Sequence, residues 1–214
     1  AEAARCLECG VCSECMQCVY ACKANAIDHG QAESVQRVEV GAVILAPGVE
    51  PATRFIRPEY GYGRYPNVVT NIEFERMLSA SGPFMGAVQR PSDGRHPVRV
   101  AWIQCVASRD DACGQGYCSS ICCMAATKEA LIAREHDPRI EPSVFYIDVR
   151  AFGKGFDDYV ERAEKEQGVR YVRSMVSAVR EVPGTRDLRL HYATFDAAGA
   201  PQRHEELFDL VVLS

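Results

Sequence analysis

The chain has 214 residues, a formal net charge of −5 and a hydrophobic content of 47%. This length and composition are typical of a globular protein with one or two domains and a sizeable core. The charge gives no basic surface for nucleic acid, and no apolar run has the length of a transmembrane helix or the character of a signal peptide. We therefore expect a cytoplasmic protein without a transmembrane segment or a nucleic-acid partner.

Cysteine is the unusual component, because the chain has 11 of them and they fall into two clusters. Secreted disulfide frameworks spread their cysteines across the fold. Closely spaced thiols in a chain without an export signal are instead typical of metal ligation. The odd total also fits disulfides poorly, so the pattern predicts metal centres.

The first cluster lies in a cysteine-rich segment, residues 1–34, that we expect to bind an iron–sulfur cluster. Its last four cysteines have the spacing C-x2-C-x2-C-x3-C, as in ferredoxins, although Lys23 stands where ferredoxins usually have proline. Zinc, which also accepts four thiolates, is the alternative. The sequence leaves open which four of the six share one cluster. The predicted ligands are Cys6, Cys9, Cys12, Cys15, Cys18 and Cys22.

Residues 35–97 are expected to form one strand and a long crossover. The Ala46-Pro47-Gly48 turn resembles the alanine-threonine-glycine turn that closes the flavin domain of two-dinucleotide-binding flavoproteins, with Pro47 in place of threonine, which implies part of a flavin domain here. The apolar run Ala42–Leu45 predicts a short strand buried in a parallel sheet. Open α/β sheets bind ligands where their strands end. The turn that follows the run therefore supplies the candidate cofactor-binding residues Ala46, Pro47 and Gly48.

The crossover after this turn is rich in proline, glycine and tyrosine, and we expect one helix within it. The helix is predicted from about Asn71 to Ala80, with Thr70 or Asn71 as its N-cap and Glu73 in its first turn.

Residues 98–214 are expected to form a Rossmann-like domain in which a cysteine site replaces the phosphate loop. The segment begins with a strand and continues to a helix at Met124–Glu135. In nucleotide-binding units the turn between such elements is glycine-rich, whereas here it carries five cysteines. Cys118 and Cys122 are four residues apart and so are predicted to share a helical face, near the positive end of the helix dipole. The predicted ligands are Cys105, Cys118, Cys122 and Cys123.

Other interpretations of this cysteine cluster stay open. Cys113 lies beside glycines on a flexible segment and is the weakest candidate ligand. Cys123 taken alone is compatible with a small buried hydrophobic residue. Cys122 and Cys123 are also compatible with a redox-active pair, although a disulfide between adjacent cysteines is strained.

The α/β pattern continues beyond residue 140. The acidic residue that ends the second strand, Asp148, stands where a nucleotide ribose would be bound, but the missing glycine-rich turn argues against NAD. We expect strands at Pro142–Ile147 and Val169–Val172, a helix at Phe156–Gln167, an antiparallel hairpin with turns at Pro183-Gly184 and Ala198-Gly199, and a final strand at Leu207–Leu213 that returns to the parallel sheet.

Several motifs together resemble the A subunits of heterodisulfide reductases and the related flavoprotein subunits of electron-bifurcating complexes. They include VGAVILAPG, IQCVASRD, YCSSICCMAATKEA and VFYIDVRAFGKGF. The resemblance implies a thioredoxin-reductase-like core, an FAD that splits electron pairs, and several 4Fe-4S clusters that relay single electrons. It also implies that one cluster is held by Cys105, Cys118, Cys122 and Cys123.

These expectations combine into an α/β protein with a thioredoxin-reductase-like (Rossmann-type) sheet, a partial flavin domain and a cysteine-rich N-terminal segment. Both ends of the sequence look cut, so we expect a piece of a longer polypeptide that is inactive alone. One or two 4Fe-4S clusters are expected in this chain. FAD is expected in the longer protein, because the flavin fingerprint is missing here. Other redox subunits and a homodimer are the expected partners. The alternative functions are a zinc-stabilised interaction module and a dithiol oxidoreductase that uses Cys122 and Cys123.

Overall fold

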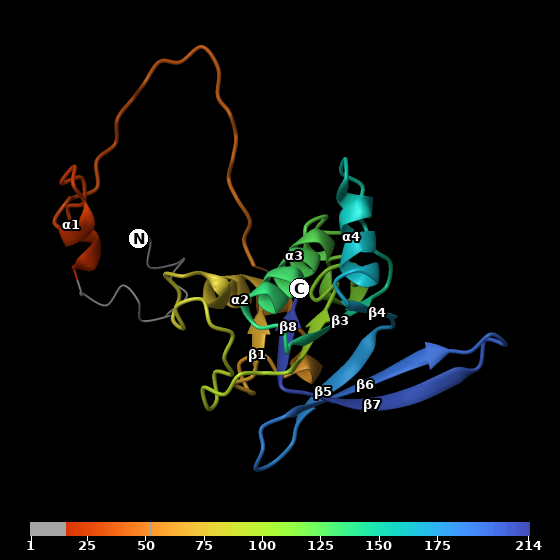
Figure 1. Cartoon of the computed structure of the whole chain (residues 1–214). Coiled ribbons are helices and arrows are strands. Elements are labelled where there is room, and N and C mark those ends of the chain that lie inside the picture. The colour runs from red at the N-terminus through yellow and green to blue at the C-terminus, as the bar shows by residue number, and fades with distance from the viewer. Residues whose placement is uncertain (1–15, 52) are drawn as a thin grey trace. The chain divides into compact units, whose positions relative to one another are not determined.

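The computed structural model describes residues 16–51 and 53–214 of the chain. The chain divides into two compact units, an N-terminal unit of residues 1–51 and a main unit of residues 52–214 (Figure 1). The described part of the N-terminal unit contains one short helix, α1 (Gln17–Ala21), followed by chain without regular secondary structure.

The predicted strand at Ala42–Leu45 is wrong. These residues form no strand, and the side chains of Val43, Ile44 and Leu45 are exposed. A strand needs a neighbour whose backbone groups complete its hydrogen bonds. Among the described residues no strand pairs with this run, so its apolar composition alone does not make it part of a sheet.

A five-stranded sheet forms the centre of the main unit, with the strand order β1-β8-β2-β3-β4. Every neighbouring pair of these strands is parallel. The predicted strands near residues 98, 142 and 169 are confirmed within one or two residues, and the chain returns to this sheet at its end as expected. Val68–Thr70 was not predicted as a strand. The strands are β1 (Val68–Thr70), β2 (Arg99–Ile103), β3 (Glu141–Tyr146), β4 (Arg170–Arg173) and β8 (Leu210–Leu213).

Three α-helices of the main unit each follow a strand of the parallel sheet in chain order. The helix predicted from residue 71 is confirmed as α2, and Thr70 is its N-cap. The Glu73 N–H donates to Thr70 Oγ1 at 3.3 Å, and the Thr70 N–H donates to Glu73 Oε2 at 2.7 Å, which is a capping box. The helices are α2 (Asn71–Leu78), α3 (Cys122–His136) and α4 (Phe156–Lys165), with short 3₁₀ helices η2 (Thr53–Phe55), η3 (Pro58–Tyr60) and η4 (Asp111–Cys113).

A second sheet is antiparallel and consists of β5 (Val176–Glu181), β6 (Leu188–Phe195) and β7 (Pro201–Phe208), in that order. Its two turns lie where the sequence predicted them. Gly184 has φ 89° and Gly199 has φ 80°, values that glycine adopts without a steric penalty. The final strand is shorter than predicted, because residues 207 and 208 belong to β7.

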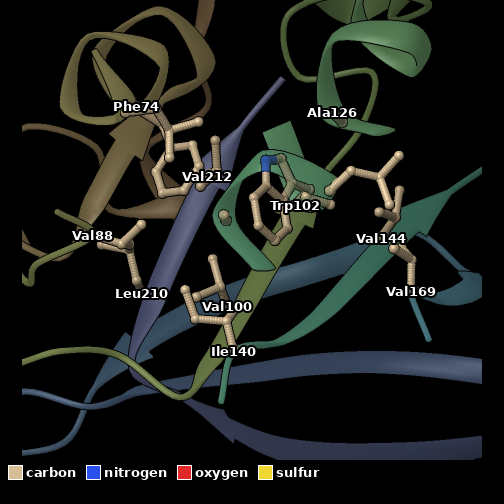
Figure 2. Packing of buried hydrophobic residues seen from close by; sticks show 14 of the residues in the cluster. Phe74, Val88, Val100, Trp102, Ala126, Ile140, Val144, Val169, Leu210 and Val212 are labelled. Atoms are coloured by element: carbon tan, nitrogen blue, oxygen red, sulfur yellow. The ribbon is translucent and has the colours of Figure 1, made fainter. Parts of the chain in front are cut away.

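Strand alternation divides the core into two layers, one on each face of the parallel sheet. Val100 and Trp102 of β2 pack with residues of α2, α3 and α4, including Phe74 and Ala126 (Figure 2). Ala101 and Ile103 of β2 face the opposite side, where the antiparallel sheet covers them. The main unit therefore consists of helices, a parallel sheet and an antiparallel sheet, in that order. Within the part of the chain that the structure describes, no helix has the length and apolar character needed to cross a membrane.

Candidate metal centre

The second cysteine cluster lies where β2 ends and α3 begins, at the carboxyl edge of the parallel sheet. Gln104 continues the strand, because its N–H donates to the Phe145 carbonyl at 2.9 Å. Cys105 follows with φ 61°, a left-handed conformation that interrupts the extended strand. Cys122 and Cys123 are the first two residues of α3 and are buried. The edge where α/β sheets bind their ligands thus carries thiols from both elements.

Three of these thiols interact directly. Side-chain hydrogen bonds from Cys105 and Cys123 lower the pKa of Cys122. The bond to Cys122, together with burial, raises the pKa of Cys105, and the same two causes raise the pKa of Cys123. Three neighbouring sulfurs cannot all ionise easily, since thiolates repel one another. A positively charged metal group removes that repulsion, so the arrangement has the chemistry of a metal site.

Cys118 lies near the other three but not where the sequence predicted. Its sulfur interacts electrostatically with Cys123 and accepts a hydrogen bond from the Ser120 N–H at 3.3 Å. The prediction that Cys118 and Cys122 share a helical face is wrong, because α3 begins only at Cys122. Ser120 has φ 64°, which a right-handed helix cannot contain. Cys118 is therefore carried by the loop before the helix.

The four cysteines do not form a ready-made site for a single ion. Among the residues that the structure describes, no group of three or more His, Cys, Asp or Glu side chains is placed to hold a metal ion. The donor set itself fits a thiolate-bound group, since four thiols from a strand end, a loop and a helix start are the ligands that iron–sulfur clusters and structural zinc use. The first turn of α3 also has no acidic residue and no side-chain cap, so its N–H groups favour an anionic group.

Cys113 makes its contacts elsewhere. Its sulfur donates to Asp110 Oδ2 at 3.4 Å and to the Phe55 carbonyl at 3.7 Å. Arg57 Nε donates to the same Asp110 oxygen at 2.6 Å. Cys113 therefore belongs to a polar contact between the cysteine loop and the segment that begins the main unit.

The loop is also tied to the end of β3. Arg109 forms an ion pair with Asp148, and Arg150 Nε lies 3.6 Å from the second carboxylate oxygen of Asp148. The Cys123 sulfur donates to the Asp148 carbonyl at 3.9 Å. Asp148, which the sequence predicted at the position of a ribose ligand, thus contacts the cysteine loop through Arg109.

The first cysteine cluster falls mostly outside the described residues. Cys6, Cys9, Cys12 and Cys15 lie there, and so does the side chain of Cys18, whose backbone belongs to α1. Cys22 ends this helix, and its sulfur accepts a hydrogen bond from the Ala26 N–H at 3.3 Å. Backbone hydrogen bonds, the strongest from Ala26, lower the pKa of Cys22 and so favour the thiolate that binds metal.

The candidate cofactor-binding residues Ala46, Pro47 and Gly48 lie in an exposed stretch of the N-terminal unit. Gly48 has φ 75°, so a turn does follow the apolar run. Their assignment to a cofactor stays a prediction.

Two polar residues at the sheet edge were missed from the sequence. Gln104 is 6% exposed, and both of its side-chain polar atoms lack a hydrogen-bond partner among the described residues. Arg109 makes the ion pair to Asp148 described above. Gln104 had a detectable signal, because it is a polar residue that continues the inward alternation of Val100 and Trp102.

Comparison with known proteins identifies relatives of the chain. No family model matches the chain. It is 45% identical over 191 residues to the iron–sulfur A subunit, form 2, of the CoB–CoM heterodisulfide reductase of Methanopyrus kandleri, covering 89% of this chain and 29% of that protein. It is 43% identical over 183 residues to the iron–sulfur A subunit of the CoB–CoM heterodisulfide reductase of Methanocaldococcus jannaschii, covering 86% of this chain and 27% of that protein. It is 41% identical over 203 residues to the A subunit of the H(2):CoB-CoM heterodisulfide,ferredoxin reductase of Methanothermobacter marburgensis, covering 94% of this chain and 30% of that protein. The chain spans less than a third of the length of these curated relatives. Over most of its length, the chain is homologous to one part of the A subunits of heterodisulfide reductases.

Proposed function

We propose that this chain is the electron-transfer part of an iron–sulfur flavoprotein oxidoreductase of the heterodisulfide reductase A type. In this proposal Cys105, Cys118, Cys122 and Cys123 hold one 4Fe-4S cluster. The cysteines between residues 6 and 22 hold a second cluster. A cluster bound at the sheet edge would accept and release one electron at a time, and the chain supplies its ligands, its burial and its hydrogen bonds.

The observation that carries the proposal is the interaction of three thiols at one point of the sheet edge. Cys105, Cys122 and Cys123 shift one another's pKa values, so these thiols lie close together although one comes from a strand end and two from a helix start. Cys118 lies in the loop that joins these elements, and its sulfur interacts electrostatically with Cys123 and raises the pKa of that thiol. The family supports iron–sulfur over zinc, because two of the relatives are named as iron–sulfur subunits.

The whole protein is expected to do more than this chain. We propose that its core is thioredoxin-reductase-like and binds FAD, and that residues 46–48 contribute to that site. The support is the parallel sheet with helices on one face and an antiparallel sheet on the other. We further propose that the protein splits electron pairs in a complex with other redox subunits, forms a homodimer, and works in the cytoplasm, where clustered thiols are kept reduced.

Anaerobic reconstitution with iron and sulfide tests the metal sites. Cys122→Ser is the deciding variant, and Cys113→Ser is its matched control, because Cys113 lies on the same loop but contacts Asp110 and Phe55. Cys122→Ser should lose about four iron atoms per chain and one electron paramagnetic resonance signal, while the N-terminal signal remains. Cys113→Ser should keep both signals. If Cys122→Ser also keeps both, the second site is assigned to the wrong residues.

The same experiment separates the two alternative functions. Stoichiometric zinc without visible absorption would indicate a zinc-stabilised interaction module. A dithiol oxidoreductase would instead show two fewer titratable thiols after oxidation, with that change lost in Cys123→Ser. Broad visible absorption that depends on iron supports the proposed electron-transfer function against both.

A further inference from the structure

Gln104 has a side chain that the fold buries without giving it a partner. The residue is 6% exposed, and neither Nε2 nor Oε1 has a hydrogen-bond partner among the described residues. A buried amide normally has a hydrogen-bond partner, because its donors and acceptor lose their hydrogen bonds to water on folding and an unpaired group bears that desolvation cost uncompensated. Such an orphaned group indicates that something outside the described atoms completes it.

The position of Gln104 indicates what that partner is. The residue directly precedes Cys105, and its backbone N–H is already bonded to the Phe145 carbonyl at 2.9 Å. Because strand side chains alternate, Gln104 lies on the same face of the sheet as Val100 and Trp102. That face packs against α3, whose first two residues are cysteines. Gln104 therefore lies at the end of β2 on the face that α3 covers, one residue before the first cysteine of the site.

We propose that Gln104 is a positioning residue of the metal centre, whose side-chain N–H groups donate a hydrogen bond to sulfur of the cluster held by Cys105 and Cys122. This inference rests on the proposed function. A cluster with four thiolate ligands is anionic and offers sulfur acceptors, so it suits an amide donor. The hydrogen bond strengthens when the cluster gains an electron, because the sulfur then carries more negative charge. Gln104 thus raises the reduction potential of this cluster.

The charge around the site agrees with this role. The first turn of α3 presents N–H groups without an acidic residue or a side-chain cap. The carboxylate of Asp148 is paired with Arg109 of the cysteine loop, and the carboxylate of Asp110 is paired with Arg57. Arg109 and the first turn of α3 therefore offer donors near the cysteines, and Gln104 would add a donor from the strand end. A hydrocarbon side chain at this position would fill the same space without leaving polar atoms unpaired, so packing alone does not account for an amide.

The test is a redox titration of the reconstituted full chain, followed by electron paramagnetic resonance. Gln104→Met keeps the size of the side chain and removes the donor. At a fixed potential it should lower the ratio of reduced to oxidised cluster by up to about tenfold, equivalent to about 59 mV for one electron. The N-terminal cluster serves as an internal reference whose midpoint should not move. Gln115→Met, on the same loop, is the matched control and should leave both midpoints unchanged.

A second variant guards against misfolding. Gln104→Leu also removes the amide donor with a side chain of similar size, so it should lower the midpoint by about as much as Gln104→Met does. Equal midpoints in the parent and in a folded variant that still binds the cluster would overturn this inference and leave the proposed function standing. A parent chain without any second cluster signal would overturn both.

Discussion

Glu129 of α3 should make the stability of the main unit depend on pH in an unusual direction. Its carboxyl group is fully buried, its Oε2 accepts a hydrogen bond from Trp102 Nε1 at 2.9 Å, and its Oε1 has no partner among the described residues. Burial raises the pKa of Glu129 from 4.5 to about 8, and the bond from Trp102 opposes that shift only in part. The group is therefore protonated in the folded chain at neutral pH.

The sign follows from the two pKa values of Glu129. Below pH 4.5 the carboxyl of Glu129 is protonated in both the folded and the unfolded chain, and its full contribution to the stability of the folded chain is present. Between 4.5 and about 8 the unfolded chain loses the proton while the folded chain keeps it, so stability falls as pH rises. The loss is at most about 1.4 kcal/mol for each pH unit, and a few kcal/mol over the whole window. Above pH 8 the stability lost through Glu129 stays constant.

Glu129→Gln removes this titration and keeps an oxygen that accepts from the indole. We expect the variant to be more stable than the parent at pH 8 by a few kcal/mol, and the gain to shrink steadily toward pH 5. Urea unfolding followed by fluorescence measures it well, since Trp102 is the one tryptophan of the chain. Glu135→Gln, exposed on the same helix, is the control and should change little. A stability difference between parent and Glu129→Gln that does not vary from pH 5 to 8 would refute the reasoning.

Three further substitutions test how the main unit is held together, each by chemical denaturation. Thr70→Ala removes the side-chain oxygen of the capping box and should cost about 1 kcal/mol; an unchanged midpoint would mean the cap is dispensable. Gly61→Ala should destabilise, because Gly61 has φ 75° and an added Cβ would run into the Tyr65 ring, whereas a stabilised variant would contradict that contact. Arg90→Ala should cost about 3 kcal/mol, since Arg90 is buried and bonds Asp187 at 2.7 Å, and a loss below about 1 kcal/mol would show the pair to be replaceable.

Local signals in the sequence predicted local structure well. The start of α2 followed from Thr70 and Glu73, whose capping box depends on residues only three apart. The antiparallel turns followed from Gly184 and Gly199, where a positive φ is needed. These features form from neighbours in the chain, so a short window of sequence contains the cause.

Strand pairing was harder, because a strand exists only together with its partner. Val68–Thr70 is only three residues long and sits in a stretch rich in turn-forming residues, yet it becomes β1 by pairing with β8 at the far end of the chain. Ala42–Leu45 has a stronger apolar pattern but pairs with no strand among the described residues. Composition indicated which segments favour a strand, and long-range contacts decided which of them became one.

In the cysteine site, too, one part was predictable from the sequence and another part was not. That Cys105 and the first cysteines of α3 meet was predictable, because a strand end and the following helix start share one edge of a parallel sheet. The place of Cys118 was not, because it depends on a left-handed Ser120 that separates it from the helix. A non-glycine residue rarely adopts that conformation, and nothing in the local sequence signals it. The unpartnered state of Gln104 likewise requires a side-chain environment that a pattern does not contain.

The pairing of Asp148 with Arg109 explains how this edge of the sheet differs from a nucleotide site. In a nucleotide site an acidic residue at the end of the second strand accepts hydrogen bonds from a ribose, and a glycine-rich turn approaches the phosphates. Here the carboxylate of Asp148 is bound by Arg109, which belongs to the loop that replaced that turn. The same carboxylate cannot hold both a ribose and the guanidinium without weakening one contact. The acidic position therefore anchors the cysteine loop, and Arg109→Ala should loosen the loop without creating a nucleotide site. Fluorescence titration with NADH checks this, because saturable binding by that variant would mean that Arg109 blocks a functional ribose site.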